Sequence, residues 1–308
     1  MTRTDSARAS LLSQTQALLH AHGLRPRRRR GQNFLVDPGV RDRIVAAAGL
    51  GPEHLVVEIG PGTGILTDAL LRIGASVLAV ELDRDLVRLL SERWGGNPRF
   101  AIRSADALEF DFAQALQGDP RRGRARVVAN IPYYITTPLI LRLVRQRELF
   151  EVLLLTVQRE VAERLTAAPG KKSYGALTLA CQYWASVRAV DAIPRTAFHP
   201  VPEVDSTLVR FDLLDAPRVQ VAEPAQLFTV IRAAFAVRRK TLRNALCRAG
   251  WPARDVERAL ECVGVAAMRR GETLTLDEFA RLSEALPSRT SGDCAAGEHP
   301  NPGRDAES

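Results

Sequence analysis

Residues 55–64 read Leu-Val-Val-Glu-Ile-Gly-Pro-Gly-Thr-Gly, an apolar run followed at once by glycine at every second position. A short apolar run bounded by glycine predicts a buried β-strand. Glycine has no Cβ, so the turn after the strand can be sharp and can approach a ligand closely. A helical pattern begins directly after this turn. The sequence therefore predicts a strand, a ligand-binding turn and a helix, which is the repeating unit of ligand-binding α/β sheets.

Further apolar runs continue this alternation of strands and helical patterns. Successive runs begin 21 to 26 residues apart, the length that a strand and its crossover helix need, so we expect a parallel sheet with helices on both faces. Two later β-rich segments are expected to form an antiparallel pair that closes the sheet. The predicted fold class is therefore α/β with a mostly parallel, seven-stranded sheet. The strands expected after 55–59 are 76–80, 100–103, 126–129, 152–157, 185–193 and 206–213.

Four segments of different character divide the chain. Residues 1–24 hold an amphipathic helix, expected at 6–22, and residues 25–215 hold the sheet domain. Residues 216–286 form a small helical domain, and residues 287–308 lack large apolar side chains and are expected to be a disordered tail. The helices expected in the small domain are 225–236, 240–249, 255–262 and 276–285.

Composition places the chain among soluble globular proteins. Apolar residues make up 46% and charged residues 25% of the 308 residues, which excludes collagen-like, low-complexity and disulfide-scaffold classes. No apolar run is long enough for a membrane span or a signal peptide. The four cysteines stand alone, without metal-ligand spacing, so we expect no metal and a reduced, cytoplasmic setting. The net charge of +8 suggests a polyanionic partner.

Two acidic residues follow the second and third predicted strands, at the edge where α/β sheets bind ligands. Glu81 lies 21 residues after Gly60, where a carboxylate can accept both hydroxyls of a ribose, and Asp106 can accept an amino proton of adenine. The turn with Gly60 and Gly62 lacks the spacing of a phosphate-binding loop. This pattern favours S-adenosylmethionine, an adenosine without phosphate, as cofactor of a Rossmann-like methyltransferase. NAD remains the alternative cofactor.

The fourth strand ends in Asn130-Ile131-Pro132-Tyr133-Tyr134, a sequence suited to methylating the exocyclic amine of adenine. The lone pair of that amine is delocalised, so an acceptor must hold the N–H groups and aim the nitrogen at the methyl donor. The Asn130 side chain and the carbonyl of Ile131 or Pro132 can accept these protons. Tyr133 can stack on a flipped base, and Phe198 can close the other ring face. The candidate catalytic residues are Asn130, Pro132, Tyr133 and Phe198.

Seven ordered motifs over about residues 20–285 resemble those of the ribosomal RNA adenine dimethyltransferases of the KsgA/RsmA type. The resemblance implies a cytoplasmic, monomeric enzyme that dimethylates the N6 amines of two adjacent adenosines in a hairpin near the 3′ end of small-subunit ribosomal RNA. It also implies that the partner is ribosomal RNA within the immature small subunit. The cofactor-binding residues that it implies are Asn33, Leu35, Gly60, Gly62, Glu81, Asp106 and Asn130. The motifs are 31–35, 58–64, 81–83, 106–108, 130–133, 198–206 and 238–244.

Two other functions stay open at this point. Ile131 and the Phe-His-Pro sequence from Phe198 are common in the sister (Erm) family, which methylates a large-subunit adenine and confers antibiotic resistance. A non-catalytic RNA-binding assembly factor is the second alternative, although the presence of Glu81, Asp106 and Asn130 argues against it.

Clusters of basic residues support an RNA partner in every case. One cluster precedes the first motif, and the other lies in the small domain, where several basic residues share one helical face. The predicted RNA contacts are Arg27, Arg28, Arg29, Arg30, Arg238, Arg239, Lys240 and Arg243.

Overall fold

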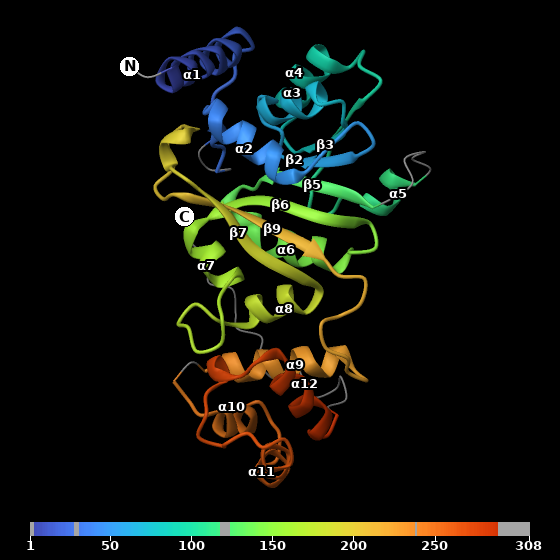
Figure 1. Cartoon of the computed structure of the whole chain (residues 1–308), viewed down its shortest axis with the longest axis vertical. Helices are drawn as coiled ribbons and strands as arrows, with labels where there is room; N and C mark the ends of the chain where they lie inside the picture. The colour runs from blue at the N-terminus through green and yellow to red at the C-terminus, as the bar shows by residue number, and fades with distance from the viewer. Residues whose placement is uncertain (1–2, 28–30, 118–123, 238, 289–308) are drawn as a thin grey trace, which may run out of the picture. The chain divides into compact units, whose positions relative to one another are not determined.

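A computed structural model describes residues 3–27, 31–117, 124–237 and 239–288 of the chain (Figure 1). The chain divides into two compact units, Met1–Arg218 and Val219–Ser308. The expected domain boundary after residue 215 lies in the same loop, between the last strand of the first unit and the first helix of the second. The predicted disordered tail lies outside the described residues from 289 onward.

A seven-stranded sheet in the order β4-β3-β2-β5-β6-β9-β7 forms the centre of the first unit. The five strands β2 to β6 run parallel, and β9 pairs antiparallel with both β6 and β7. The predicted seven strands and the antiparallel closure are therefore confirmed, with some strands slightly longer than expected. Their bounds are β2 Leu55–Ile59, β3 Ser76–Glu81, β4 Phe100–Ser104, β5 Ala125–Asn130, β6 Phe150–Gln158, β7 Ala185–Ile193 and β9 Ser206–Leu213.

Helices pack on both faces of this sheet because alternate side chains of a strand point to opposite faces. Val56 on β2 packs in one apolar cluster with Ile44 and Leu70, whereas its neighbour Val57 packs in another with Leu139. The expected helices on both faces are thus confirmed (Figure 1). They are α2 Pro38–Ala48, α3 Ile65–Arg72, α4 Arg84–Trp94, α5 Phe112–Leu116, α6 Thr136–Arg145, α7 Arg159–Leu165 and α8 Ala176–Trp184.

A second, two-stranded sheet joins the N-terminal part of the first unit to a loop far along the chain. Strand β1, Phe34–Leu35, pairs antiparallel with β8, Phe198–His199, so that Leu35 is opposite Phe198. The backbone N–H of Val36 extends the pairing by donating to the Ala197 carbonyl at 2.8 Å. The sequence did not predict this sheet, which places the 31–35 motif beside the 198–206 motif.

The N-terminal helix α1, Arg3–Ala21, belongs to the first unit. Its residue Leu19 is buried in a small cluster with Phe34 of β1 and Leu86 of α4. The helix therefore supports the segment that leads into β1.

The second unit is helical, as the sequence predicted. Buried apolar residues on each helix form its interior, among them Leu227, Leu246, Leu260 and Phe279. The last helix begins with a capping box, in which Thr275 accepts from the Glu278 N–H and Glu278 accepts from the Thr275 N–H. None of the helices that the structure describes has the length and apolarity of a membrane span. The helices are α9 Pro224–Phe235, α10 Leu242–Arg248, α11 Ala253–Cys262 and α12 Leu276–Ala285.

Candidate functional site

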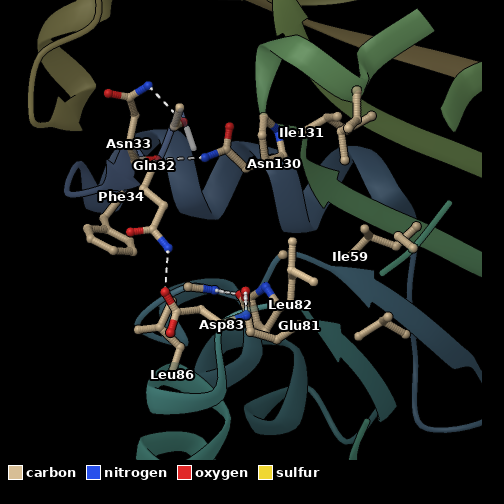
Figure 2. A pocket seen from close by; sticks show the side chains of 18 of the residues that line it. Gln32, Asn33, Phe34, Ile59, Glu81, Leu82, Asp83, Leu86, Asn130 and Ile131 are labelled. Atoms are coloured by element: carbon tan, nitrogen blue, oxygen red, sulfur yellow. Dashed lines mark hydrogen bonds between the residues drawn. The ribbon is translucent and has the colours of Figure 1, made fainter. Parts of the chain in front are cut away.

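One pocket, which is open to solvent, lies at the carboxyl ends of strands β2, β3 and β5 (Figure 2). This is the edge at which open α/β sheets bind ligands. The pocket lining brings together every predicted cofactor and catalytic residue of the first unit. These residues are Asn33, Leu35, Gly60, Gly62, Glu81, Asp106, Asn130, Pro132, Tyr133 and Phe198.

The glycine turn after β2 has a backbone conformation that favours glycine, and at Gly62 it also lacks room for a side chain. Gly60 and Gly62 have φ values of 68° and 59°, in the left-handed region that other residues rarely adopt. A Cβ on Gly62 would lie 2.9 Å from the Phe34 ring, closer than real Cβ contacts occur. The turn therefore presents backbone to the pocket, and Phe34 packs directly against it.

Glu81, at the end of β3, is almost fully buried at the pocket wall. One carboxylate oxygen accepts the Asp83 N–H at 2.9 Å, and the other accepts the Gly62 N–H at 3.3 Å. Burial raises the pKa of Glu81 above its ordinary value, although both hydrogen bonds act to lower it. A carboxylate has about four acceptor positions, so this one can still accept two hydroxyl groups from a ligand.

Asp106, in the loop after β4, reaches the same pocket. Its Oδ1 accepts the Leu108 N–H at 2.8 Å, which holds the carboxylate in one orientation. The loop is tied to β3, because the Ala105 N–H donates to the Glu81 carbonyl at 3.0 Å. The two acids that the sequence singled out are therefore linked through the backbone.

Glu58 is a buried acid beneath the glycine turn to which the sequence reasoning gave no role. Its side chain is on the face of β2 that packs against α3, where Oε2 accepts the Thr67 hydroxyl at 2.6 Å. Among the described residues, Oε1 has no hydrogen-bond partner. Burial, with a smaller contribution from the nearby Glu81, raises the pKa of Glu58 to about 7. The sequence did contain a signal for this residue, namely an acidic side chain within an otherwise apolar predicted strand.

Arg27 and Gln32 contact two acidic residues where β3 leads into α4, namely Asp83 in the loop and Asp85 in the first turn of α4. The Arg27 guanidinium lies 3.2 Å from Asp83 and 3.1 Å from Asp85. Gln32 donates to Asp83 at 3.1 Å and accepts the Arg27 N–H at 2.8 Å (Figure 2 shows the Gln32–Asp83 bond). Arg27, which the sequence assigned to RNA, is thus bound to carboxylates beside the pocket. Arg28, Arg29 and Arg30 lie outside the described residues.

Asn130 ends β5 with its side-chain amide in a fixed orientation. Its Nδ2 donates to the Asn33 carbonyl at 3.0 Å, as Figure 2 shows. Because this partner is a carbonyl oxygen, the amide nitrogen must face it, and Oδ1 remains as the acceptor. Asn33 therefore orients Asn130 through its backbone, a role that the motif order alone could not reveal.

The two backbone carbonyls that the sequence left as alternatives differ in their bonding. The Pro132 carbonyl accepts the Ile135 N–H at 3.2 Å and the Thr136 hydroxyl at 3.3 Å, which occupies both its lone pairs. The Ile131 carbonyl has no donor among the described residues. The geometry therefore favours Ile131 as the backbone acceptor, with Pro132 fixing the chain that follows it.

Two aromatic rings border the acceptor end of the pocket. Tyr133 is half-buried, and its hydroxyl lies 3.3 Å from the Ser206 hydroxyl at the start of β9. Burial raises the pKa of Tyr133, so the phenol is neutral at physiological pH. Phe198 is buried and is held by the pairing of β8 with Leu35. The unexpected small sheet is what brings Phe198 to the pocket.

The predicted RNA contacts of the second unit are not equivalent. Arg239 and Lys240, just before α10, are exposed and have no acidic partner in the part of the chain that the structure describes. Arg243 is ion-paired with Glu257 at 2.7 Å. Arg238 lies outside the described residues. The described residues contain no group of three side chains that could hold a metal ion.

Comparisons with known proteins agree with this geometry. The model of the family described as ribosomal RNA adenine dimethylase matches residues 23–286. The chain is 44% identical over 277 residues to ribosomal RNA small subunit methyltransferase A of Moorella thermoacetica, which covers 88% of this chain and 96% of that protein.

Two solved structures share the fold over most of the chain. A dimethyladenosine transferase from Plasmodium falciparum is similar with a TM-score of 0.70 and 27% identity, over 81% of this chain and 95% of the other. The 23S rRNA methyltransferase ErmE is similar with a TM-score of 0.63 and 28% identity, over 82% of this chain and 99% of the other.

Proposed function

Because the chain belongs to the ribosomal RNA adenine dimethylase family, we propose that it methylates the exocyclic amines of adenosines in small-subunit ribosomal RNA with S-adenosylmethionine. The finer proposal is that two adjacent adenosines in a hairpin near the 3′ end each receive two methyl groups. The substrate is then the immature small subunit in the cytoplasm, and the enzyme acts as a monomer. The observation that carries the proposal is the fixed Asn130 amide, whose Oδ1 is left as an acceptor in the pocket.

The residues of the pocket fit S-adenosylmethionine. Glu81 retains acceptor positions for a ribose diol, Asp106 retains an oxygen for the adenine amine, and the turn at Gly60 and Gly62 gives close access to backbone. The Gly-x-Gly-x-Gly spacing of this turn differs from the Gly-x-Gly-x-x-Gly spacing of loops that bind the pyrophosphate of NAD, which disfavours NAD. When bound, S-adenosylmethionine supplies an electrophilic methyl group on a positively charged sulfur. Asn33 and Leu35 complete the proposed cofactor wall from β1 and the residue before it.

The acceptor end of the pocket can prepare an adenine amine for methylation. Asn130 Oδ1 and the Ile131 carbonyl each accept one N–H, which aims the nitrogen lone pair away from the ring plane. Tyr133 and Phe198 hold the base by its faces. No strong base is required, because the nitrogen becomes acidic only after it has gained the methyl group and then loses its proton to water. The first product keeps one N–H, so a second transfer can follow.

The choice between small- and large-subunit RNA is testable with purified particles. The 44% identity to a small-subunit enzyme, against 28% to ErmE, favours the small subunit. We expect label from methyl-labelled S-adenosylmethionine to enter immature small subunits at two neighbouring adenosines, mapped by mass spectrometry of RNA fragments. Label only in large subunits would assign the protein to the sister activity. Binding of RNA without any label would support a non-catalytic assembly factor.

A further inference from the structure

Tyr134 is an exposed aromatic residue at a pocket whose aromatic neighbours are covered. Its relative exposure is 57%, whereas Phe198 is 3% exposed. Leu82, Val201 and Val204 are also exposed. Leu82 lines the same pocket, and the two valines lie in the loop that connects Phe198 to β9. Tyr134 and Leu82 thus bring two exposed apolar side chains to one pocket, and exposed apolar groups at a pocket are typical of a surface that binds a partner.

The local backbone directs Tyr134 away from the base that Tyr133 would hold. Both residues lie in the 3₁₀ turn η2, Tyr133–Ile135. A 3₁₀ turn has three residues per turn, so consecutive side chains point about 120° apart. Tyr133 is half-buried against Ser206, and Tyr134 is left facing solvent. The two rings therefore cannot clamp one base between them.

The surroundings of Tyr134 suit a nucleotide. A Cβ placed on Gly31 would lie 4.0 Å from Cδ1 of the Tyr134 ring, so the ring lies alongside the 31–35 motif. An exposed aromatic ring beside a pocket is the kind of platform on which proteins stack unpaired bases, because every base has a π-face.

We propose that Tyr134 is a stacking platform for the nucleotide next to the adenosine that is being methylated. Neighbouring nucleotides share one phosphodiester, so when one base turns into the pocket, the next stays at its opening. The proposal rests on the proposed function and adds how the RNA strand is positioned there. Tyr134 then acts in substrate binding and leaves the chemistry to Asn130.

The test compares three RNA hairpins with one target adenosine each. In the first hairpin both neighbouring nucleotides are intact. In the second and third hairpins an abasic nucleotide replaces the neighbour on the 5′ side or on the 3′ side. Methylation is measured for the wild type, Tyr134→Ala and Tyr134→Phe. Met268→Ala is the matched control, because Met268 is an exposed apolar residue of the second unit, 78% exposed.

We expect Tyr134→Ala to raise KM for the intact RNA roughly 5- to 100-fold, the range of one lost stacking contact, with kcat nearly unchanged. Tyr134→Phe keeps the ring and should recover most of the affinity. On one of the two abasic RNAs, the wild type and Tyr134→Ala should have the same KM within about two-fold. Met268→Ala should behave as the wild type on every RNA.

The platform would be overturned if Tyr134→Ala raised KM equally for the intact RNA and for both abasic RNAs, or if it did not raise KM at all. Failure of the proposed function gives a different result, namely no methyl transfer by the wild type to immature small subunits in the labelling experiment. In that case the affinities of the same variants for the same RNAs, measured by fluorescence anisotropy, decide the platform by the same comparison.

Discussion

The two sides of the pocket differ in how much of their hydrogen-bonding capacity the protein itself uses. On the cofactor side, the Glu81 carboxylate is buried and already accepts two backbone N–H groups, and Asp106 accepts one. On the base side, Asn130 Oδ1 and the Ile131 carbonyl remain as acceptors. The cofactor side consists of Gly60, Gly62, Glu81 and Asp106, and the base side of Asn130, Ile131, Tyr133, Tyr134 and Phe198.

This difference indicates that the two sides of the pocket have different roles in binding. A preformed, desolvated cofactor side loses little entropy when it binds a ligand of constant shape. The base side must admit one nucleotide of a large RNA, so it keeps an exposed ring in Tyr134 and acceptors that the amine of a base can satisfy. Changes on one side should therefore alter cofactor affinity, and changes on the other should alter methyl transfer or RNA binding.

Asn130→Ala should give the largest effect, because it removes the side-chain acceptor that positions the amine. We expect the rate of methyl transfer to fall roughly 100- to 1000-fold, as for the loss of one positioned transition-state hydrogen bond. Cofactor affinity, measured by calorimetry, should stay within a few-fold. Asn97→Ala, at a half-buried asparagine that does not line the pocket, is the matched control. Undiminished turnover in Asn130→Ala would refute the assignment of this side chain.

Glu58→Gln should change how stability depends on pH. Burial raises the pKa of Glu58 from an ordinary value of 4.5 to about 7. Between these values the folded state keeps a proton that the unfolded state has lost, so the free energy of unfolding falls as pH rises. This loss of unfolding free energy is absent below pH 4.5, and above pH 7 it has a constant value of about 3 kcal/mol. Denaturant unfolding at several pH values should show that the free energy of unfolding of the variant does not fall over this range. A difference in unfolding free energy between variant and wild type that is the same at every pH would contradict the prediction.

Glu81→Ala should weaken the cofactor side alone. Hydrogen bonds to a charged group contribute about 1.5 to 3 kcal/mol, so the Kd for S-adenosylmethionine should rise roughly 10- to 100-fold. The affinity for RNA should change little. Glu53→Ala, an exposed acid before β2 and away from the pocket, provides the control in the same calorimetric titration. Equal losses of cofactor and RNA affinity would show that the two sides are not separate.

Replacing both Arg239 and Lys240 by Ala should give the smallest effect. Each cation that neutralises a phosphate adds about 0.7 to 0.9 to the slope of log affinity against log salt, so the slope should flatten by roughly 1.5. Arg243→Ala is the informative comparison, because its guanidinium is already paired with Glu257 and should matter less. A larger change in this slope for Arg243→Ala than for the double variant of Arg239 and Lys240 would show that the RNA binds a different surface.

The fold and most of the pocket could be predicted from the sequence. Apolar runs such as Leu55–Ile59 and the glycine turn after it are local patterns, and the side-chain period of a strand or helix is a property of neighbouring residues. The acids Glu81 and Asp106 and the amide Asn130 follow strands directly. Since parallel strands end at one edge of a sheet, locating the strands also located these side chains.

The tertiary structure alone decided which distant segments meet and which polar groups remain available. Two-residue strands such as β1 and β8 are too short to show any periodicity, so their pairing, which brings Phe198 to Leu35, left no local signal. An arginine paired with carboxylates, as Arg27 is, cannot be distinguished in the sequence from one that awaits phosphate. The same holds for the occupied Pro132 carbonyl and the exposed Tyr134 ring, because hydrogen bonding and burial depend on contacts between residues that are remote along the chain.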